Sequence, residues 1–463
     1  MKNMKTNLMS RRHFLAATSA LAGTALLNAT PAAHAETFAN QSKTSGKKLR
    51  LAMIGTGHRG TGMWGHDLVR EYPEYIEFVG LCDNNPGRLE TGKQLMGVSC
   101  PTYTDFEKMM KETRPDVLLV MTVDGTHHEF ITRGMELGAD IITEKPMTID
   151  EKKIQLILDA EKRTGKKCRV TFNYRYSPHR VKIWELLNAG EIGDLTSVDF
   201  HWYLDTSHGA DYFRRWHRLV EQGGSLWVHK ASHHFDLLNW WINSDPETVY
   251  ALGELNFYGK NGPFRAENCR NCPHTEKCNF FWDITKDKRL SALYVANEKY
   301  DRYHRDGCVF RNDVNIFDKM AATIKYVNGV QVSYSLTAYS PYEGYRIAFN
   351  GTDGRIDAWI QESQPVSDVN YDEIVLFKNF SKRQYFQIPQ SEGHGGGDKL
   401  MKDQIFLSNT ADPMKQCANT RDGALACLIG IAARNSIASK QPVNIGDLTS
   451  IKPQAVKLYE RIL

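Results

Sequence analysis

The 463-residue chain has the composition of a globular enzyme, with 41% hydrophobic residues, 24% charged residues and a formal net charge of +4. Residues 1–35 carry Lys2, Lys5, Arg11 and Arg12 and no acidic residue, so the rest of the chain is close to neutral. This balance gives no support for a nucleic-acid or membrane-surface partner. The length predicts two domains, each with enough apolar residues to bury a core.

The N-terminus is typical of a twin-arginine signal peptide, which we predict over residues 1–35. Ser10-Arg11-Arg12-His13-Phe14-Leu15 precedes a weakly apolar, alanine-rich run and the small-x-small site Ala33-His34-Ala35. The run is too short and too mildly apolar for membrane anchoring. We therefore expect the twin-arginine export machinery to deliver the folded protein to the periplasm, with residues 36–48 as a linker.

The next segment, residues 49–172, alternates predicted strands and helices, which indicates a doubly wound parallel sheet of the α/β class. Strands are expected at Leu49–Ile54, Ile76–Cys82, Val117–Thr122, Ala139–Thr143 and Arg169–Asn173, and helices from about Gly60, at Asp105–Lys111 and near His128–Leu137.

A glycine-rich turn, Gly55-Thr56-Gly57-His58-Arg59-Gly60, follows the first strand. In this pattern the first glycine permits a tight turn, the second lets the backbone approach a pyrophosphate, and the third lets the helix pack on the strand. Asp83 ends the second strand at the spacing of a carboxylate that accepts hydrogen bonds from ribose hydroxyls. The same carboxylate would repel a 2′-phosphate, so the sequence predicts NAD rather than NADP.

Strand-like runs dominate the second domain, which we predict over residues 173–420 as an α/β domain with a large open, mainly antiparallel sheet. After a helix at Val181–Asn188, strands are expected at Leu195–Tyr203, Thr248–Phe257, Met320–Val327, Val330–Thr337, Tyr345–Asn350 and Glu373–Lys378, with a hairpin turn at Asn328-Gly329. Residues 421–463 form the C-terminal segment. Its helix, Arg421–Ser439, is expected to pack back on the first domain.

Lys145 lies in Thr143-Glu144-Lys145-Pro146, directly after an apolar strand. This position is a carboxyl end of the first sheet, where ligands of open α/β sheets bind. A lysine there can orient or deprotonate a hydroxyl, or polarise the carbonyl that forms as hydride leaves. A surface lysine before a turn proline is the alternative interpretation.

In this order the motifs resemble the Gfo/Idh/MocA family, the relatives of glucose-fructose oxidoreductase and inositol dehydrogenase. The resemblance implies that Thr122, His127, Glu144 and Lys145 contact the nicotinamide cofactor, and that Lys145 and His233 contact the reacting carbinol. It also implies a sugar or cyclitol substrate on the sheet face of the second domain, and a homo-oligomer. The matching pieces are the glycine-rich turn, Cys82-Asp83, Thr122 with His127, Glu144-Lys145-Pro146, Asn173-Tyr174-Arg175, Gly193, Gly223-Gly224-Ser225-Leu226, His233-His234-Phe235-Asp236 and Gly351-Thr352-x-Gly354.

One departure from the family's pattern concerns proton transfer. Where the family has Asp-x-Gly-x-His, this chain has His229-Lys230-Ala231-Ser232-His233, so the acid is replaced by His229 or lost. We expect His233 to act as the base with Lys145 assisting. His229 or Lys230 could instead contact an anionic substrate.

Aromatic and basic residues near these motifs are candidate substrate contacts. Aromatic faces stack on sugar rings, and guanidinium groups bind carboxylates in bidentate pairs. A basic rim with aromatic residues in the core is the competing interpretation, as is a flexible turn for the glycine-rich loop around His394. The candidates are Tyr174, Arg175, Arg215, Trp216, Lys230, His234 and His394.

Four cysteines, Cys269, Cys272, Cys278 and Cys308, fall in a predicted cysteine-rich insertion over residues 260–310. Four thiolates could bind a structural Zn²⁺ tetrahedrally and lock an insertion that lacks a core of its own. An iron–sulfur cluster and disulfides in an oxidising compartment are the alternatives.

These patterns favour an exported oxidoreductase that acts on a CH–OH group of a sugar or cyclitol with tightly held NAD. The rival is an NAD-dependent glycosidase, in which transient oxidation at C3 allows elimination, addition of water and return of the hydride. Related exported N-acetylgalactosaminidases lack the Glu-Lys-Pro of this chain, which favours the oxidoreductase. A non-catalytic sugar-binding protein is the third interpretation.

Overall fold

The computed structural model describes residues 47–363, 370–407 and 412–455. The predicted signal peptide and nearly all of the predicted linker lie outside these residues. Among the helices that the structure describes, none is long and apolar enough to cross a membrane.

The first domain is built on a parallel sheet that has six strands within the described residues, in the order β3-β2-β1-β4-β5-β6. Apolar side chains of these strands are almost completely buried, which agrees with a sheet that is covered by helices on both faces. The predicted doubly wound sheet is confirmed. Its strands are β1 (Leu49–Ile54), β2 (Ile76–Cys82), β3 (Thr102–Tyr103), β4 (Val117–Val120), β5 (Asp140–Thr143) and β6 (Cys168–Val170).

Helices of the first domain begin where polar side chains cap them. Asn85, Asp105 and Asp150 each accept a hydrogen bond from the backbone N–H three residues on, and so satisfy a free donor at the helix start. The elements are α2 (His58–Thr61), η1 (Gly62–His66), α3 (Asp67–Glu71), α4 (Pro86–Met96), α5 (Phe106–Thr113), η2 (Asp124–Thr126), α6 (His127–Glu136) and α7 (Glu151–Thr164).

The second domain has a sheet of nine strands in the described part of the chain, in the order β14-β13-β12-β11-β7-β10-β9-β8-β15. Its strands pair antiparallel except for β7 and β10, which confirms a mainly antiparallel sheet. The strands are β7 (Leu195–Asp205), β8 (Pro246–Glu254), β9 (Lys319–Tyr326), β10 (Gln331–Ser340), β11 (Glu343–Gly351), β12 (Gly354–Ser363), β13 (Tyr371–Lys378), β14 (Gln384–Pro389) and β15 (Val443–Asn444).

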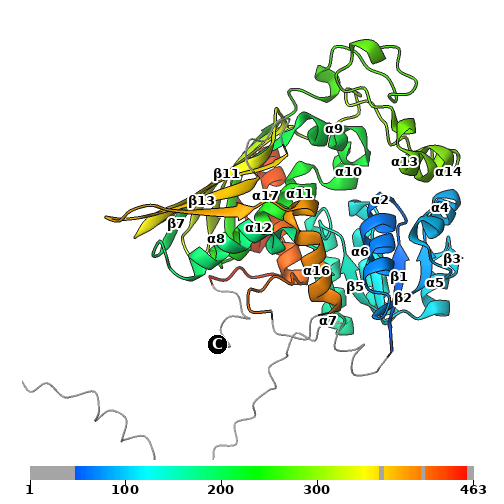
Figure 1. The fold of residues 1–463 in the computed structure, drawn as a ribbon, viewed down its shortest axis with the longest axis horizontal. Coiled ribbons are helices and arrows are strands. Elements are labelled where there is room, and N and C mark those ends of the chain that lie inside the picture. The colour runs from blue at the N-terminus through cyan, green and yellow to red at the C-terminus, as the bar shows by residue number, and fades with distance from the viewer. Residues whose placement is uncertain (1–46, 364–369, 408–411, 456–463) are drawn as a thin grey trace, which may run out of the picture. The chain divides into compact units, whose positions relative to one another are not determined.

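Helices α8 (Pro178–Asn188), α12 (Ala231–Ile242) and α17 (Thr420–Ser439) lie on one face of this sheet (Figure 1). All of α12 is buried. Helix α17 packs chiefly against α12 and β8, and to a lesser extent against α7 and β6. Helix α17 was expected to pack on the first domain. It does so with the smaller part of its surface, because its apolar side chains are shared between the two domains.

Short helices lead from β6 and β7 toward α12, and others precede α17. They carry most of the candidate site residues outside the first sheet. They are η3 (Asn173–Tyr176), α9 (Thr206–Arg214), η4 (Trp216–Arg218), α10 (Val220–Gly223), α11 (Leu226–His229), α15 (Glu392–Gly395) and α16 (Gly397–Phe406), and η9 (Ile445–Asp447) follows β15.

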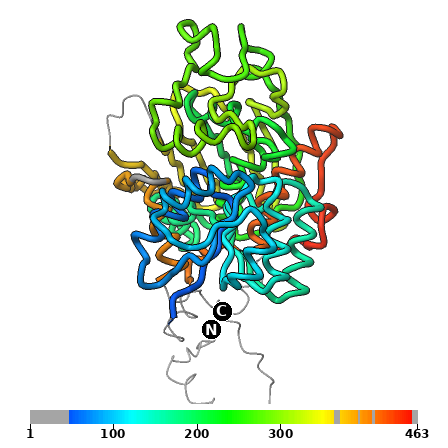
Figure 2. Tube along the Cα trace, turned by 90° about the vertical axis from the view of Figure 1, so that its right-hand side faces the viewer, coloured from blue at the N-terminus to red at the C-terminus, as the bar shows by residue number. Residues whose placement is uncertain are grey.

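Residues 255–318, between β8 and β9, form an insertion of loops and short helices. Its small core of Ile284, Leu290, Leu293 and Tyr294 packs against Leu95 of α4, so the insertion reaches the first domain. The views from two directions agree, with the insertion next to α4 (Figures 1 and 2). Its helices are η5 (Gly259–Asn261), η6 (Thr275–Lys277), η7 (Ile284–Lys286), α13 (Lys288–Leu293), η8 (Val295–Asn297) and α14 (Glu298–Asp301).

Candidate active site

The glycine-rich turn between β1 and α2 has the geometry that a dinucleotide needs. Gly55 has a φ of +92°, and a Cβ there would lie 2.5 Å from the carbonyl oxygen of Met121. A Cβ on Gly60 would lie 2.4 Å from the carbonyl oxygen of Gly55. Only glycine fits both positions, and the turn presents backbone N–H groups at the start of α2, where a pyrophosphate binds.

Asp83 is buried beside this turn. One carboxylate oxygen accepts hydrogen bonds from the backbone N–H and the hydroxyl of Thr56, at 2.9 and 3.1 Å. The other accepts from the backbone N–H of Asn85 at 2.9 Å and lies 3.4 Å from Arg88. The carboxylate therefore lies at the edge of the turn, and its contact with a ribose stays a prediction. Arg88, which also pairs with Asp301, was not predicted.

The insertion covers the turn, which the sequence did not predict. The hydroxyl of Tyr294 accepts a hydrogen bond from the backbone N–H of His58 at 2.8 Å. Asn85 donates to the backbone carbonyl of Asn297 at 3.0 Å. Burial, helped by Arg305 and other arginines, lowers the pKa of His58 to about 4, so this side chain is neutral at neutral pH. A cofactor on the turn would lie under the insertion.

Glu144 holds the side chain of Arg59 rather than facing open space. The Arg59 Nε lies 2.7 Å from the Glu144 carboxylate, and the indole N–H of Trp64 donates to the same oxygen at 2.6 Å. Arg59 also pairs with Asp398 at 3.3 Å. Burial would raise the pKa of Glu144, but Arg59, Trp64 and Lys145 together outweigh burial, so the pKa is lowered and the carboxylate stays charged. Glu144 therefore fixes Arg59 at the turn.

His127 supports the backbone at the carboxyl ends of β4 and β5. Its Nδ1 lies 2.9 Å from the carbonyl oxygen of Pro146 and its Nε2 lies 3.1 Å from that of Thr122. The Thr122 hydroxyl accepts a hydrogen bond from Thr126 at 2.9 Å. With both ring nitrogens beside carbonyls, His127 positions the segment that carries Lys145 and is not itself open to a cofactor.

Lys145 follows β5, as predicted, and its Nζ donates to the backbone carbonyl of His229 at 3.0 Å. Burial lowers the pKa of Lys145 to about 8, although Asp124 and Glu144 oppose the change. The side chain can therefore exchange a proton near neutral pH.

His229 makes a short hydrogen bond to a carboxyl group that the sequence analysis missed. Its Nδ1 lies 2.5 Å from the Oδ2 of Asp124, which follows β4 in η2 and is 3% exposed. Burial raises the pKa of Asp124 and lowers that of His229, so the pair resists carrying separated charges. Asp124 thus places a carboxyl group beside the His229–His233 motif, which has none of its own. Asp124 follows a buried parallel strand, as Lys145 does, and this position was the sequence signal that could have identified it.

His233, at the start of α12, is buried and stacks on Tyr174 with ring centroids 4.1 Å apart. Its Nδ1 has no hydrogen-bond partner among the described residues. Burial, and then the charges of Lys145 and Lys230, hold the pKa of His233 well below its usual range. It is therefore neutral at neutral pH and able to accept a proton.

Other predicted substrate contacts surround this group. Lys230 donates to the Tyr174 hydroxyl at 3.1 Å and lies 3.5 Å from Glu343. Trp216 has its ring centroid 5.8 Å from that of His229. The remaining two reach neighbouring carboxylates, Arg215 pairing with Asp211 at 2.6 Å and His394 with Asp398 at 3.0 Å.

Two predicted substrate contacts are instead part of the core. Arg175 is fully buried and forms a bidentate pair with Asp236, at 2.8 and 2.6 Å. His234 is also fully buried, stacks on Trp202 with centroids 4.0 Å apart and bonds to the hydroxyl of Tyr334 at 2.7 Å. Both side chains satisfy buried polar groups, which is why the structure keeps them from the site.

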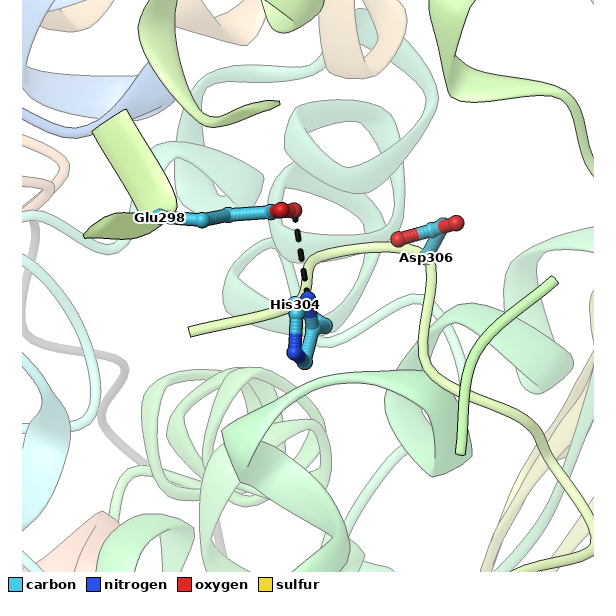
Figure 3. Close-up of side chains that lie close together, drawn as sticks. All are labelled: Glu298, His304 and Asp306. Atoms are coloured by element: carbon cyan, nitrogen blue, oxygen red, sulfur yellow. Dashed lines mark ion pairs between the residues drawn. The ribbon is translucent and has the colours of Figure 1, made fainter. Parts of the chain in front are cut away.

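The expected zinc site is not supported. Within the described ranges, the group of ligand atoms that all lie within 4.8 Å of one another is Glu298, His304 and Asp306 (Figure 3), not the four cysteines. Arg270 pairs with both carboxylates of that group, so its charge is already compensated. All nine cysteines, each within the described residues, are free thiols, which does not support the disulfide alternative.

Comparison with known proteins agrees with this arrangement. The model of the oxidoreductase family, NAD-binding Rossmann fold, matches residues 49–172, and that of the oxidoreductase family, C-terminal alpha/beta domain, matches residues 184–445. The chain is 35% identical over 424 residues to YteT of Bacillus subtilis (strain 168), whose name places it among oxidoreductases; the match covers 86% of this chain and 98% of that protein. It is 30% identical over 416 residues to glycosyl hydrolase family 109 protein 1 of Akkermansia muciniphila, covering 84% and 79%.

Solved structures show the same fold. Levoglucosan dehydrogenase in complex with NADH and levoglucosan has a TM-score of 0.62 at 18% identity, covering 86% of this chain and all of that one. An oxidoreductase from Agrobacterium radiobacter in complex with NAD⁺, L-tartaric acid and magnesium has a TM-score of 0.60 at 15% identity, covering 87% and 100%. The two family matches together span more than half of the sequence. The chain belongs to the Gfo/Idh/MocA family of NAD-binding oxidoreductases.

Proposed function

We propose that this protein transfers a hydride between a CH–OH carbon of a sugar or cyclitol and a tightly held NAD. The observation that carries the proposal is the meeting of Lys145, the Asp124–His229 pair and His233 where β4, β5 and α12 end or begin. These groups supply a cation, a buried acid–base pair and a neutral histidine beside the turn that fits a dinucleotide.

In the proposed reaction NAD, when bound, accepts the hydride that leaves the substrate carbon. His233 takes the hydroxyl proton on an unprotonated ring nitrogen, which its low pKa makes available. The Lys145 ammonium holds the substrate oxygen while a carbonyl forms, and the His229 carbonyl fixes that ammonium. Asp124 fixes the ring of His229 through Nδ1.

The site surroundings support a carbohydrate-like substrate. Trp216 is half-buried and offers an aromatic face beside His229, and Arg215 and His394 offer hydrogen-bond donors near the same group. Tyr174 and Lys230 are buried and bonded to each other, so they shape the wall behind His233. This combination suits a ring that has one apolar face and many hydroxyls. The name of a relative from Lactiplantibacillus plantarum, inositol 2-dehydrogenase/D-chiro-inositol 3-dehydrogenase, at 23% identity over 197 residues, supports the same class.

The test uses the full chain without added nucleotide and a panel of free sugars, cyclitols and aryl glycosides. We expect one substrate to give a burst of reduced nicotinamide absorbance that stops after a single turnover. Adding an oxidised sugar should reoxidise the nucleotide, lower this absorbance and allow product formation to resume. Lys145→Met should remove the burst while leaving the nucleotide content unchanged. A panel that never reduces the bound nucleotide, in protein shown to contain it, would contradict the proposal.

An NAD-dependent glycosidase is the second candidate, because a relative named for glycosyl hydrolase family 109 aligns with 84% of this chain. The hydride would return to the substrate after the glycosidic bond breaks. The same panel separates the two functions. Aryl release over many turnovers without net reduced nucleotide would identify the glycosidase.

We also propose that the protein reaches the periplasm by the twin-arginine route, with NAD loaded before export. The support is the sequence of residues 1–35. Replacing Arg11 and Arg12 together by lysine should retain the protein in the cytoplasm, as measured by cell fractionation. Unchanged export of that variant would exclude this route.

A further inference from the structure

The insertion gathers four thiols around one cavity. The cavity is small and is lined by the four cysteines together with Arg214 and several phenylalanines. Two segments of the insertion are tied together at this point, because the backbone N–H of Cys269 donates to the carbonyl of Asp306 at 2.8 Å and that of Cys308 donates to Glu267 at 3.1 Å. These backbone hydrogen bonds hold together the two segments that carry the thiols. The thiols are those of Cys269, Cys272, Cys278 and Cys308.

Hydrogen-bond donors face the sulfur atoms. The backbone N–H groups of His274 and Phe310 donate to the sulfurs of Cys272 and Cys308, each at 3.4 Å and each from two residues further along the chain. The Phe280 N–H stands in the same relation to Cys278. Such donors stabilise thiolates, which are the form that binds metals.

Arg214 adds a positive charge to the cavity wall. It is 7% exposed, and its Nη1 lies 3.1 Å from the sulfur of Cys269. Its Nη2 donates to the carbonyl of Phe280, so the guanidinium is held in this orientation. A buried cation beside four thiols suits a bound group with net negative charge.

The spacing of the thiols excludes a single zinc ion as the best fit. Zinc–sulfur bonds of ~2.3 Å in a tetrahedron put the sulfurs about 3.8 Å apart. The cysteines do not form a set whose sulfurs all lie within 4.8 Å of one another, although the described residues include such a set elsewhere. The four sulfurs are therefore more widely spaced than a tetrahedral zinc site requires. Cavity walls of phenylalanine give the low polarity in which iron–sulfur clusters are held.

We propose that the four cysteines ligate an iron–sulfur cluster of the four-iron, four-sulfide type, one thiolate on each iron. The insertion has a small core of its own, so the cluster would cross-link the loops that the core does not hold. The same insertion places Tyr294 on the glycine-rich turn. The cluster would thereby stabilise the segment that covers the cofactor, a link that rests on the proposed function.

The first test measures the metal in the full chain, purified without oxygen from cells supplied with iron. We expect about four irons and about four acid-labile sulfides per chain, with the broad visible absorption of sulfide-to-iron charge transfer. One zinc per chain without sulfide would overturn the proposal. Metal-free protein would overturn it as well, whether its four thiols can be alkylated or are joined as disulfides.

The second test replaces ligands. Cys272→Ser and Cys278→Ser should each lower the iron content by more than half, whereas Cys417→Ser, a cysteine that contacts Arg169 and Tyr176 instead of the cavity, should keep it. Equal iron in all three variants would overturn the assignment. Nucleotide content is measured in parallel, so a cluster that is present in a protein without NAD would refute the proposed function alone.

Discussion

The Asp124–His229 pair joins the segment after β4 to the end of helix α11, and it places a carboxyl group beside a local motif that has none. In Asp124→Asn the side chain keeps its size but can no longer take up or release a proton beside His229. We expect turnover to fall by about 10²-fold, in the range of lost acid–base assistance, with little change in KM or nucleotide content.

The matched control for this variant is Asp159→Asn, an exposed carboxylate on α7. Steady-state kinetics and the nucleotide released on denaturation measure both outcomes. Full activity of Asp124→Asn would make the pair purely structural.

Burial lowers the pKa of Lys145 to about 8, and this value predicts in which direction the reaction rate changes with pH. If the ammonium holds the substrate oxygen, the rate of hydroxyl oxidation falls as the pH rises through about 8. The pKa of His233 lies well below 6.5, so its loss of a proton limits the rate only in acid. Single-turnover rates measured against pH check both the decline above pH 8 and the decline in acid.

Lys145→Arg should remove the decline above pH 8, because arginine stays protonated there. A rate that rises through pH 8 in the wild type would instead identify Lys145 as the base.

At the scale of elements, the insertion acts on the glycine-rich turn through Tyr294. Tyr294→Phe removes the hydroxyl that accepts from the His58 N–H, a hydrogen bond with a net contribution of about 1 kcal/mol. We expect NAD to dissociate several-fold faster, measured by exchange with labelled nucleotide. Tyr300→Phe, an exposed tyrosine of the same insertion, is the control. Equal exchange in the two variants would show that the insertion does not retain the cofactor.

The spacing of apolar residues and the residues typical of turns were enough to predict much of this fold. Buried apolar strands followed by Gly55 and Lys145 predicted the first sheet and its ligand-binding edge, because the carboxyl ends of parallel strands meet. The Asn328-Gly329 turn predicted a hairpin, and Gly329 has a φ of +92° there. Local signals of this kind need no knowledge of long-range packing.

Contacts between distant segments were beyond the sequence. Asp124 meets His229 across 105 residues, and Tyr294 meets His58 across 236. Arg175 looked available for a substrate because its burial depends on Asp236, which tertiary packing brings to it. The sequence predicted the part of the site that lies at a single strand end. It did not predict the parts that form where the two domains meet.

For the whole molecule, the insertion lies over the glycine-rich turn of the first domain, which supports our proposal of a resident cofactor that is not exchanged during turnover. The most direct measurement follows the hydride itself. A substrate that reduces the bound nucleotide is prepared with deuterium at its CH–OH carbons, and the nucleotide released from the protein is analysed by mass spectrometry. We predict reduced NAD carrying one deuterium, and none in Lys145→Met. Oxidised product formed with unlabelled nucleotide would contradict hydride transfer at this site.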